Sequence, residues 1–186
     1  SESVKYFSLS KILKEKHDEY LKRQVLAYTL DSQVQKSINI IKNNKKKPSI
    51  NFFEAKLLLI INNFKLKKFD QNIELLDELE IYGDYSSYQY IIYEVLNNYN
   101  DLFITREIQN NDESNFGKLS LINDAFKHCY LNEPETSSKF ISLINSDDGD
   151  YTRYLFFYFN TLIDNKDFES AKQISKTLNI LDRNLL

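Results

Sequence analysis

The sequence contains few of the residues that support chemistry or tight turns. Its 186 residues include one cysteine, two histidines, three glycines and two prolines, and neither methionine nor tryptophan. One cysteine cannot form an internal disulfide, and no apolar run reaches the roughly 18 residues that a membrane-spanning helix needs. We therefore expect a reducing, cytoplasmic location and no membrane partner. Scarce glycine and proline favour a packed helical protein, and a 42% content of hydrophobic residues argues against disorder.

The reactive side chains form no pattern that is typical of catalysis or metal binding. His128 and Cys129 are neighbours in "KHCY", and adjacent residues on a helix point in different directions. A cysteine nucleophile needs a group that lowers its pKa and a positioned oxyanion site, and the sequence indicates neither. The acidic turn "DDGD", residues 147–150, lacks the alternating oxygen ligands and the closing glutamate of a calcium loop. We therefore expect no enzymatic activity, no metal and no cofactor, with His128 on a helix surface and Cys129 half-buried.

Charge is distributed unevenly along the chain. The net charge is −3, but residues 1–70 carry about +8 and the remainder carries about −11. The basic half contains the run "KNNKKKP", residues 42–48. Lysines of this kind can contact phosphates, but the run lacks the interleaved aromatic residues of a nucleic-acid-binding surface. We interpret it as a solvated loop between helices.

Apolar residues recur at three- and four-residue steps along nearly the whole chain, which predicts about ten α-helices separated by short polar breaks. Two of these segments, "AKLLLIINNF" (55–64) and "YLFFYFNTLI" (154–163), are apolar around most of the helix, and we expect both in the interior. Side chains that can cap a helix N-terminus stand before several predicted helices. These are Ser32, Ser49, Asp70, Asp150 and Asp167.

A weak internal repeat accompanies the helical pattern. The segment "NEPETSSKFISL" (132–143) aligns with "KDFESAKQISKTL" (166–178) at an offset of 34 residues, which places Ser137 on Ala171. Thirty-four residues is the tetratricopeptide period. A small residue at this position would let the two helices of a hairpin approach closely.

The same opening occurs earlier, where Phe69 takes the place of Phe168. We therefore predict an all-α fold in which residues 1–186 form a single helical repeat domain. The predicted architecture is an irregular tetratricopeptide-like right-handed α-solenoid of about ten helices.

One turn resembles a known family. In "LEIYGDY" (79–85) the order of residues is similar to a segment of the Rgg/MutR-type transcriptional regulators that reads aliphatic, Glu, any residue, Trp-Gly and then aromatics, with Tyr82 in the place of the tryptophan. Gly83 would end a helix there in the left-handed conformation. The segment "NYNDLF" (98–103) then falls where this family carries a similar sequence, and a looser likeness covers most of residues 4–178.

The resemblance implies a regulatory domain that binds a short hydrophobic signalling peptide in the cytoplasm, as in quorum sensing, and forms a homodimer. We expect the dimer to use the apolar residues of "NILDRNLL", residues 179–186. Members of the family begin with a helix-turn-helix DNA-binding domain, which this sequence does not show, so DNA would be bound only through that missing domain. The alternative function is a tetratricopeptide-like scaffold that holds another protein.

Asparagine and aromatic side chains supply the expected peptide site. Asparagine offers a donor and an acceptor to an extended backbone, and aromatic rings add contact area at little entropic cost. Asn160 is an amide within an apolar helix, where it must find a partner. Arg153 is expected to receive a peptide carboxylate. The predicted peptide-binding residues are Tyr90, Tyr93, Asn123, Lys127, Arg153, Tyr158 and Asn160.

Overall fold

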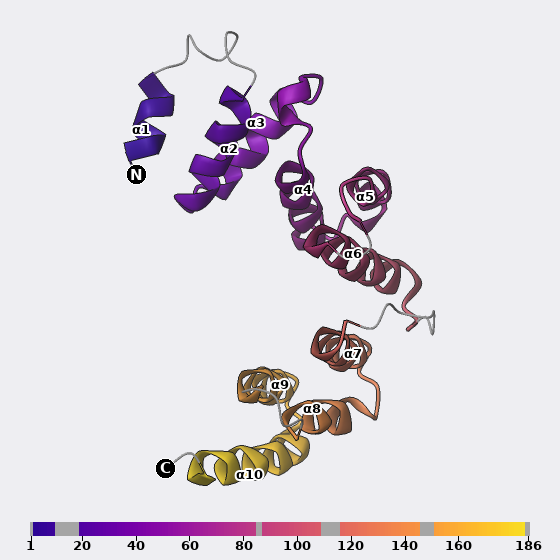
Figure 1. Ribbon diagram of the computed structural model, residues 1–186. Coiled ribbons are helices and arrows are strands. Elements are labelled where there is room, and N and C mark those ends of the chain that lie inside the picture. Colours follow the sequence, from indigo (N-terminus) through magenta and orange to yellow (C-terminus); the bar gives the residue numbers. More distant parts are fainter. Residues whose placement is uncertain (1, 10–18, 85–86, 109–115, 146–150, 185–186) are drawn as a thin grey trace. The chain divides into compact units, whose positions relative to one another are not determined.

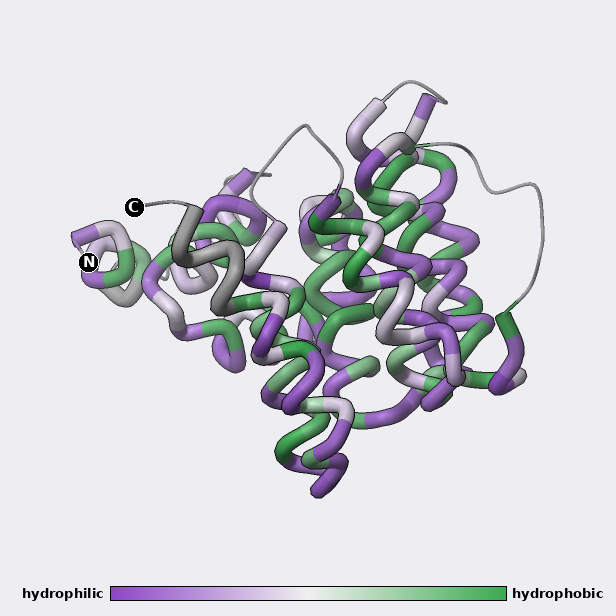
Figure 2. The backbone as a smooth tube through the Cα atoms, turned by 90° about the horizontal axis from the view of Figure 1, so that it is seen from below, coloured by the Kyte–Doolittle hydropathy of each residue, from purple (hydrophilic) through white to green (hydrophobic). Residues whose placement is uncertain are grey.

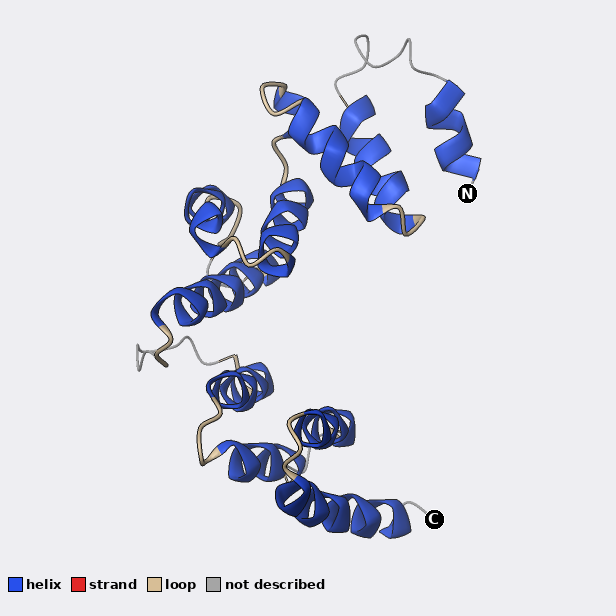
Figure 3. Cartoon of the chain, turned by 180° about the vertical axis from the view of Figure 1, so that it is seen from behind, coloured by secondary structure: helices blue, strands red, loops and turns tan. Residues whose placement is uncertain are grey.

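The computed structural model describes residues 2–9, 19–84, 87–108, 116–145 and 151–184, with the side chains of residues 8, 9 and 179–184 excepted. Within these ranges there are ten α-helices, two short 3₁₀-helices and no strand, so the all-α prediction is confirmed (Figure 3). None of the helices in the described ranges is both long and apolar enough to cross a membrane. The chain divides into two compact units, Ser1–Ile104 and Thr105–Leu186, and each has its own core.

The first unit is built mainly from helical hairpins (Figure 1). Its elements are α1 (Glu2–Leu9), α2 (Tyr20–Leu30), α3 (Val34–Asn43), η2 (Pro48–Ile50), α4 (Phe53–Lys65), η3 (Phe69–Asn72), α5 (Ile73–Glu80) and α6 (Tyr88–Thr105). Helix α2 packs on α3, and α4 packs on α5. Hydrophobic and hydrophilic residues alternate along the helical turns in Figure 2, as expected for helices that bury one face.

Helix α4 is the centre of the first unit. Ala55 and Leu59 join an apolar cluster with α1, α2 and α3, whereas Phe53 and Ile60 join a second cluster with α5 and α6. Because α4 has apolar neighbours on two sides, the prediction that this segment lies in the interior is confirmed. Its solvent-facing residues include Ile61, which is exposed.

Three buried asparagines connect α4, η3 and α6. Asn63 Nδ2 donates a hydrogen bond to Asn72 Oδ1 (3.0 Å), and Asn72 Nδ2 donates to Asn100 Oδ1 (3.3 Å). The three side chains are 7%, 0% and 1% exposed. A buried amide without a partner costs about 1–3 kcal/mol, so these bonds remove a penalty that α6 would otherwise incur when it packs here. We call these three residues the asparagine ladder.

Two further residues of the segment "NYNDLF" also pack against the first unit. Leu102 is buried, and the Phe103 ring lies 5.5 Å from Phe64 and 4.9 Å from Phe69 between ring centroids. Together with Asn100 of the asparagine ladder, these contacts fix the C-terminal half of α6 against α4 and η3. The segment that supported the family resemblance therefore has a structural role here.

The second unit contains two further hairpins. Its helices are α7 (Lys118–Leu131), α8 (Thr136–Ile144), α9 (Thr152–Asp164) and α10 (Phe168–Asn184). Helix α7 packs on α8, α8 on α9, and α9 on α10. Phe140 is the fully buried centre of the core, and its ring stacks on Tyr158 with centroids 4.7 Å apart. Leu155 and Ile174 complete this core from α9 and α10.

Helix α9 does not lie wholly in the interior. Leu155, Tyr158 and Leu162 are buried, but Phe156 and Phe157 are exposed. The expectation for this segment is therefore wrong. Helices α8 and α10 cover one face of α9, and a ring of α7 contacts another part of it, but Phe156 and Phe157 remain about half exposed.

Four helices of the structure end in the same turn. The residues Ser32, Lys67, Asn132 and Lys166 are all left-handed, with φ between 56° and 62°. In the α7 example, Asn132 N donates to Cys129 O and Glu133 N donates to His128 O, which is the bond pattern of a Schellman cap. The other three turns have the equivalent pair of bonds. None of the four uses glycine, the residue that adopts this conformation at least cost.

Within each unit, the two caps are separated by the predicted period or by one residue more. Ser32 and Lys67 are 35 residues apart, and Asn132 and Lys166 are 34 residues apart. The fifth residue after each cap lies in the second helix of its hairpin or in the 3₁₀ turn that leads into that helix, and is a small or amide side chain that is at least partly buried. These residues are Ser37, Asn72, Ser137 and Ala171. The repeated cap is therefore followed, at a constant distance, by a side chain that permits close helix packing.

Of the five predicted N-caps, Asp167 is the one confirmed, because its Oδ1 accepts a hydrogen bond from Ser170 N (3.2 Å). Ser32 instead ends α2, since α3 begins at Val34. Ser49 lies inside η2 and Asp70 lies inside η3, and in both places the helix had already begun. Asp150 lies outside the described residues.

Gly83 is needed for space rather than for a left-handed turn. Its φ lies outside the left-handed range, so that expectation is wrong. A Cβ at this position would lie 2.8 Å from the Tyr90 backbone, closer than real Cβ atoms approach. The turn between α5 and α6 can therefore contact the first turn of α6 only with glycine at position 83.

Candidate binding sites

In the second unit, the first helices of the two hairpins meet through aromatic rings. The Phe126 ring of α7 lies 5.1 Å from Phe157 and 5.8 Å from Tyr154 of α9. Phe156 and Phe157 are 56% and 50% exposed, and Tyr130 of α7 is also exposed. We call this region the α7–α9 surface. Exposed apolar groups gathered in one place mark sites of interaction more often than scattered ones do.

Three of the predicted peptide-binding residues lie at partly or fully exposed positions of these two helices: Asn123, Arg153 and Asn160. The Arg153 guanidinium lies over the Tyr154 ring at 4.8 Å, and its Nη2 donates to Tyr154 Oη (2.9 Å). Asn160 is exposed and its Nδ2 donates to Phe156 O (3.0 Å). The expectation that this amide is enclosed in an apolar environment is wrong, because it lies on the open face of α9.

Two other predicted residues are buried. Lys127 is 5% exposed, and Tyr158 is 6% exposed. Tyr158 stacks on Phe140 and shares a 2.9 Å hydrogen bond with the Ser137 hydroxyl. Burial raises the pKa of the Tyr158 phenol, and the bond to Ser137 partly offsets that rise. Tyr158 therefore belongs to the core around Phe140, and neither side chain is exposed.

The remaining two predicted residues, Tyr90 and Tyr93, belong to α6 in the first unit, with ring centroids 6.1 Å apart. Tyr93 packs against the core of α4 and α5. Burial, followed by the nearby Glu80 carboxylate, raises the pKa of Tyr93 to about 12. The expectation that all seven residues line one cavity stays a prediction, because they are divided between the two units.

A cavity in the first unit was not anticipated from the sequence. It has a volume of about 930 Å³ and lies between the turn that follows α3, η2, α4 and α5. Its apolar lining comes from Ile41, Ile50, Ala55, Leu59, Leu75 and Ile81. The volume falls within the range of sites that hold small ligands or short peptide segments. We call it the lysine-turn cavity, for the residues on its rim.

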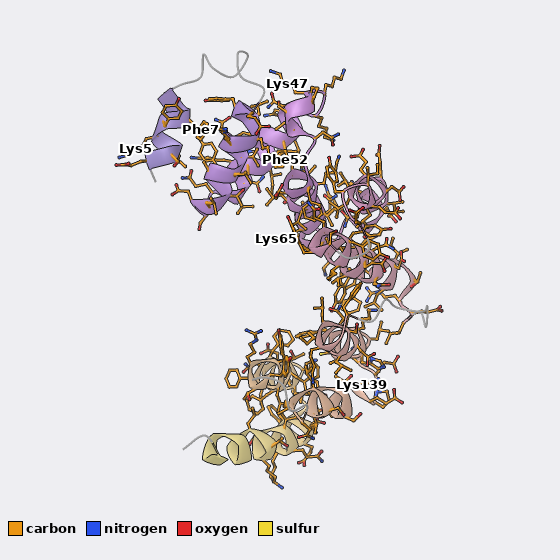
Figure 4. All side chains as sticks on the ribbon, in the orientation of Figure 1. Lys5, Phe7, Lys47, Phe52, Lys65 and Lys139 are labelled. Atoms are coloured by element: carbon orange, nitrogen blue, oxygen red, sulfur yellow. The ribbon has the colours of Figure 1, made fainter. Side chains whose placement is uncertain are left out.

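Lysines surround one side of this cavity. Lys42, Lys45, Lys46 and Lys47 all line it, and Figure 4 labels Lys47 at the turn. Lys56 also lines the cavity and forms an ion pair with Glu78. The run "KNNKKKP" does connect two helical elements, as expected, but it also forms a wall of the cavity. Pro48 and Ile50, apolar residues of the lining that follow the lysines closely, are the signal that could have indicated a ligand site.

The turn that carried the family resemblance forms another edge of the lysine-turn cavity. Tyr82 Oη donates to Asn51 Oδ1 (3.2 Å), which joins the end of α5 to the segment before α4. Both residues line the cavity. Burial, followed by the charge of Glu78, raises the pKa of the Tyr82 phenol above its ordinary value.

His128 belongs to a cluster of charged residues rather than to an open helix surface. Its Nδ1 lies 3.2 Å from Asp124 Oδ1, and Lys139 Nζ lies 2.7 Å from Asp124 Oδ2. The His128 side chain is 11% exposed, so the expectation of a surface histidine is wrong. Cys129 is half-buried, and burial raises the pKa of its thiol, which makes it a poorer nucleophile. His17 lies outside the described residues, and within them no three His, Cys, Asp or Glu side chains are placed to hold a metal.

No family model, no curated protein and no solved structure matches this chain. Its function therefore has to be inferred from the residues and their geometry.

Proposed function

We propose that this chain is the peptide-binding regulatory domain of an Rgg/MutR-type transcriptional regulator, with an irregular tetratricopeptide-like, right-handed solenoid architecture. The observation that carries the proposal is the exposed aromatic and amide surface of α7 and α9. The four equivalent caps support the repeat architecture, because helical hairpins of constant length stack with their first helices on a shared face.

The chemistry of the α7–α9 surface suits an extended hydrophobic peptide. Phe156 and Phe157 offer apolar area to peptide side chains. Peptide N–H and C=O groups need partners once water is expelled, and amides supply both kinds. Asn160 uses one N–H within its own helix, and its exposed amide has a second N–H and a carbonyl oxygen for the peptide. Arg153, also exposed, provides a cation for a carboxylate.

In this proposal the domain is cytoplasmic, dimeric and without catalytic activity, and the peptide alters the dimer. DNA would be contacted through a helix-turn-helix domain joined to this one. The residues expected to form the dimer contact, 179–186, have side chains outside the described part of the structure.

The test is a binding screen of the full 186-residue chain. A library of fluorescently labelled hydrophobic octapeptides is titrated with the protein, and anisotropy is measured. The double variant Phe156→Ser/Phe157→Ser removes exposed aromatic area, so the fold should persist while the best peptide binds about 10-fold or more weakly. Phe168→Ser is the matched control, since Phe168 is 62% exposed but lies on α10.

Equal binding by the double variant and the parent would show that the site is elsewhere. A chain that binds no octapeptide, but binds a folded protein through Phe156 and Phe157, would instead have the scaffold function.

A further inference from the structure

We propose that the lysine-turn cavity of the first unit binds the carboxyl-terminal end of a hydrophobic peptide. The terminal carboxylate would lie at the lysines of the turn, and the apolar side chains would lie on the floor formed by α3, α4 and α5. This site is separate from the α7–α9 surface. The proposal therefore stands whether or not that surface binds a peptide.

The charge of the rim favours an anionic group. Four of the cavity's lysines, Lys42 and the three at 45–47, form no ion pair with another residue in the described part of the chain. The fifth, Lys56, is already paired with Glu78, which leaves Glu74 as the other acidic group of the lining. Like charges held close together repel one another, and a carboxylate among them relieves that repulsion.

The floor favours an apolar body behind that carboxylate. Ile41, Ile50 and Leu59 contribute to the cavity and are at most 9% exposed, so they form a fixed wall of the core. Ile81 lies at the edge of the same cavity and is 83% exposed. A ligand side chain placed over Ile81 would remove a large apolar group from water, which is favourable by about 25 cal/mol per Å² covered.

The polar groups of the cavity favour a peptide over a simple alkyl acid. Asn51 and Gln71 line the cavity and are exposed. Each carries an amide that can donate to a peptide carbonyl and accept from a peptide N–H. The hydrogen bond from Tyr82 holds Asn51 in position. An alkyl chain would cover these amides without offering them a partner, and that raises the cost of binding.

The experiment uses two matched probes with the full chain. The dansylated tetrapeptide Leu-Ile-Leu-Leu is prepared with a free carboxyl terminus and with a carboxamide terminus, and dansyl fluorescence is followed during titration. We expect the free acid to bind about 10-fold more tightly than the amide, since charge-assisted hydrogen bonds are stronger than neutral ones. Added salt should weaken binding of the acid more than binding of the amide.

Charge-removal variants locate the carboxylate. Lys45→Gln/Lys46→Gln should weaken the free acid about 3- to 10-fold, as expected for the loss of two partly solvated ion pairs. Lys65→Gln/Lys68→Gln is the matched control, because both lysines are exposed and neither lines the cavity. Figure 4 labels Lys65 at the end of α4 and Lys47 at the lysine turn. Ile81→Ser should weaken both probes by a similar factor without changing the melting temperature, since Ile81 is exposed.

Three results would overturn the proposal. Equal affinity for the acid and the amide would exclude a carboxylate site, and equal losses in the two lysine variants would show non-specific attraction by charge. Displacement of the probe by decanoate at equal or lower concentration than the unlabelled tetrapeptide would show that the cavity selects lipids. The variant Phe156→Ser/Phe157→Ser should retain probe binding, so this test and that of the proposed function fail separately.

Discussion

The hairpins α4–α5 and α9–α10 have the same turn between their helices, but different side chains pack around that turn. Counted from the left-handed residue of each turn, Asn63 corresponds to Leu162 and Asn72 corresponds to Ala171. In the first unit these positions form a buried polar ladder that continues into α6, whereas in the second unit they are apolar and belong to the core. The backbone turn therefore fixes the hairpin, and the side chains around it decide what can pack on it.

The two phenylalanines that follow these turns differ for the same reason. Phe69 contacts Phe64 and Phe103, so α6 covers it. Phe168 occupies the corresponding position and is 62% exposed. Equivalent positions of two repeats thus differ in burial, because burial depends on whether the following helix packs over them.

The largest expected change in the free energy of unfolding comes from a substitution in the apolar core of the second unit. Phe140→Ala should reduce the free energy of unfolding by about 3–5 kcal/mol, because it leaves a cavity beside Tyr158 in a fully buried core. Urea denaturation followed by circular dichroism measures this. Phe168→Ala is the control and should change stability by less than about 0.5 kcal/mol. A loss below 1 kcal/mol for Phe140→Ala would mean that the second unit is not organised around this ring.

In the first unit, the comparable loss of stability is expected from a change in the asparagine ladder. Asn72→Ala removes its middle member, so the Asn63 amide and the Asn100 carbonyl lose their partners in buried positions, at a cost of about 2–4 kcal/mol. Asn51→Ala, which removes one exposed bond to Tyr82, should cost less than about 1 kcal/mol. The same denaturation experiment compares the two variants, and equal losses would contradict a special role for the ladder.

Alkaline pH should act on the first unit through Tyr93. The pKa of this phenol is about 12 in the folded protein, above its ordinary value of 10.0, so the folded state favours the neutral form. Its contribution is complete below pH 10 and is lost as the pH rises from 10 to 12, about 1–2 kcal/mol after allowance for partial exposure. Unfolding measured at pH 9 and pH 11.5 tests this. Tyr93→Phe should show a smaller alkaline loss than the parent, and an unchanged loss would exclude Tyr93 as the cause.

The smallest expected effect is shared by the two hairpins. Lys67→Gly and Lys166→Gly should each stabilise the protein by about 0.5–1 kcal/mol, because glycine adopts the left-handed conformation without the steric cost of a Cβ. Lys172→Gly, an exposed position inside α10, should destabilise by about 1 kcal/mol. The melting temperatures of the variants, compared with that of the parent, distinguish stabilisation from destabilisation. Destabilisation by both cap variants would show that the lysine side chains contribute to the caps.

Much of the fold could be predicted from the sequence, because helical periodicity is a local property. The offset of 34 residues that paired Ser137 with Ala171 also relates two equivalent caps, since the length of a hairpin is set by its two helices. The caps at Ser32, Lys67 and Lys166 carry no sequence signal, because serine and lysine occupy positions where glycine or asparagine would be expected. At Gly83 the sequence predicted a left-handed turn that is absent. A glycine can be required by close packing as well as by a left-handed turn.

The binding sites were less predictable, because exposure depends on neighbouring helices. Asn160 and Tyr158 lie two residues apart on α9, yet one is exposed and the other is buried. The asparagine ladder joins residues from three elements, and nothing in a local sequence window distinguishes these amides from the many exposed ones. The lysine-turn cavity likewise requires the tertiary contact between α3 and α4.

The half-buried thiol of Cys129 allows opening of the second unit to be followed by chemical labelling. It is the chain's one cysteine, and it packs against the core formed around Phe140. A disulfide reagent reacts with the thiolate, so burial and a raised pKa slow the reaction while the unit is closed. Opening of the second unit should expose the thiol further and speed its labelling, with no signal from the first unit, which has no cysteine. Opening of one unit can thus be followed in the unmodified protein, without an engineered probe.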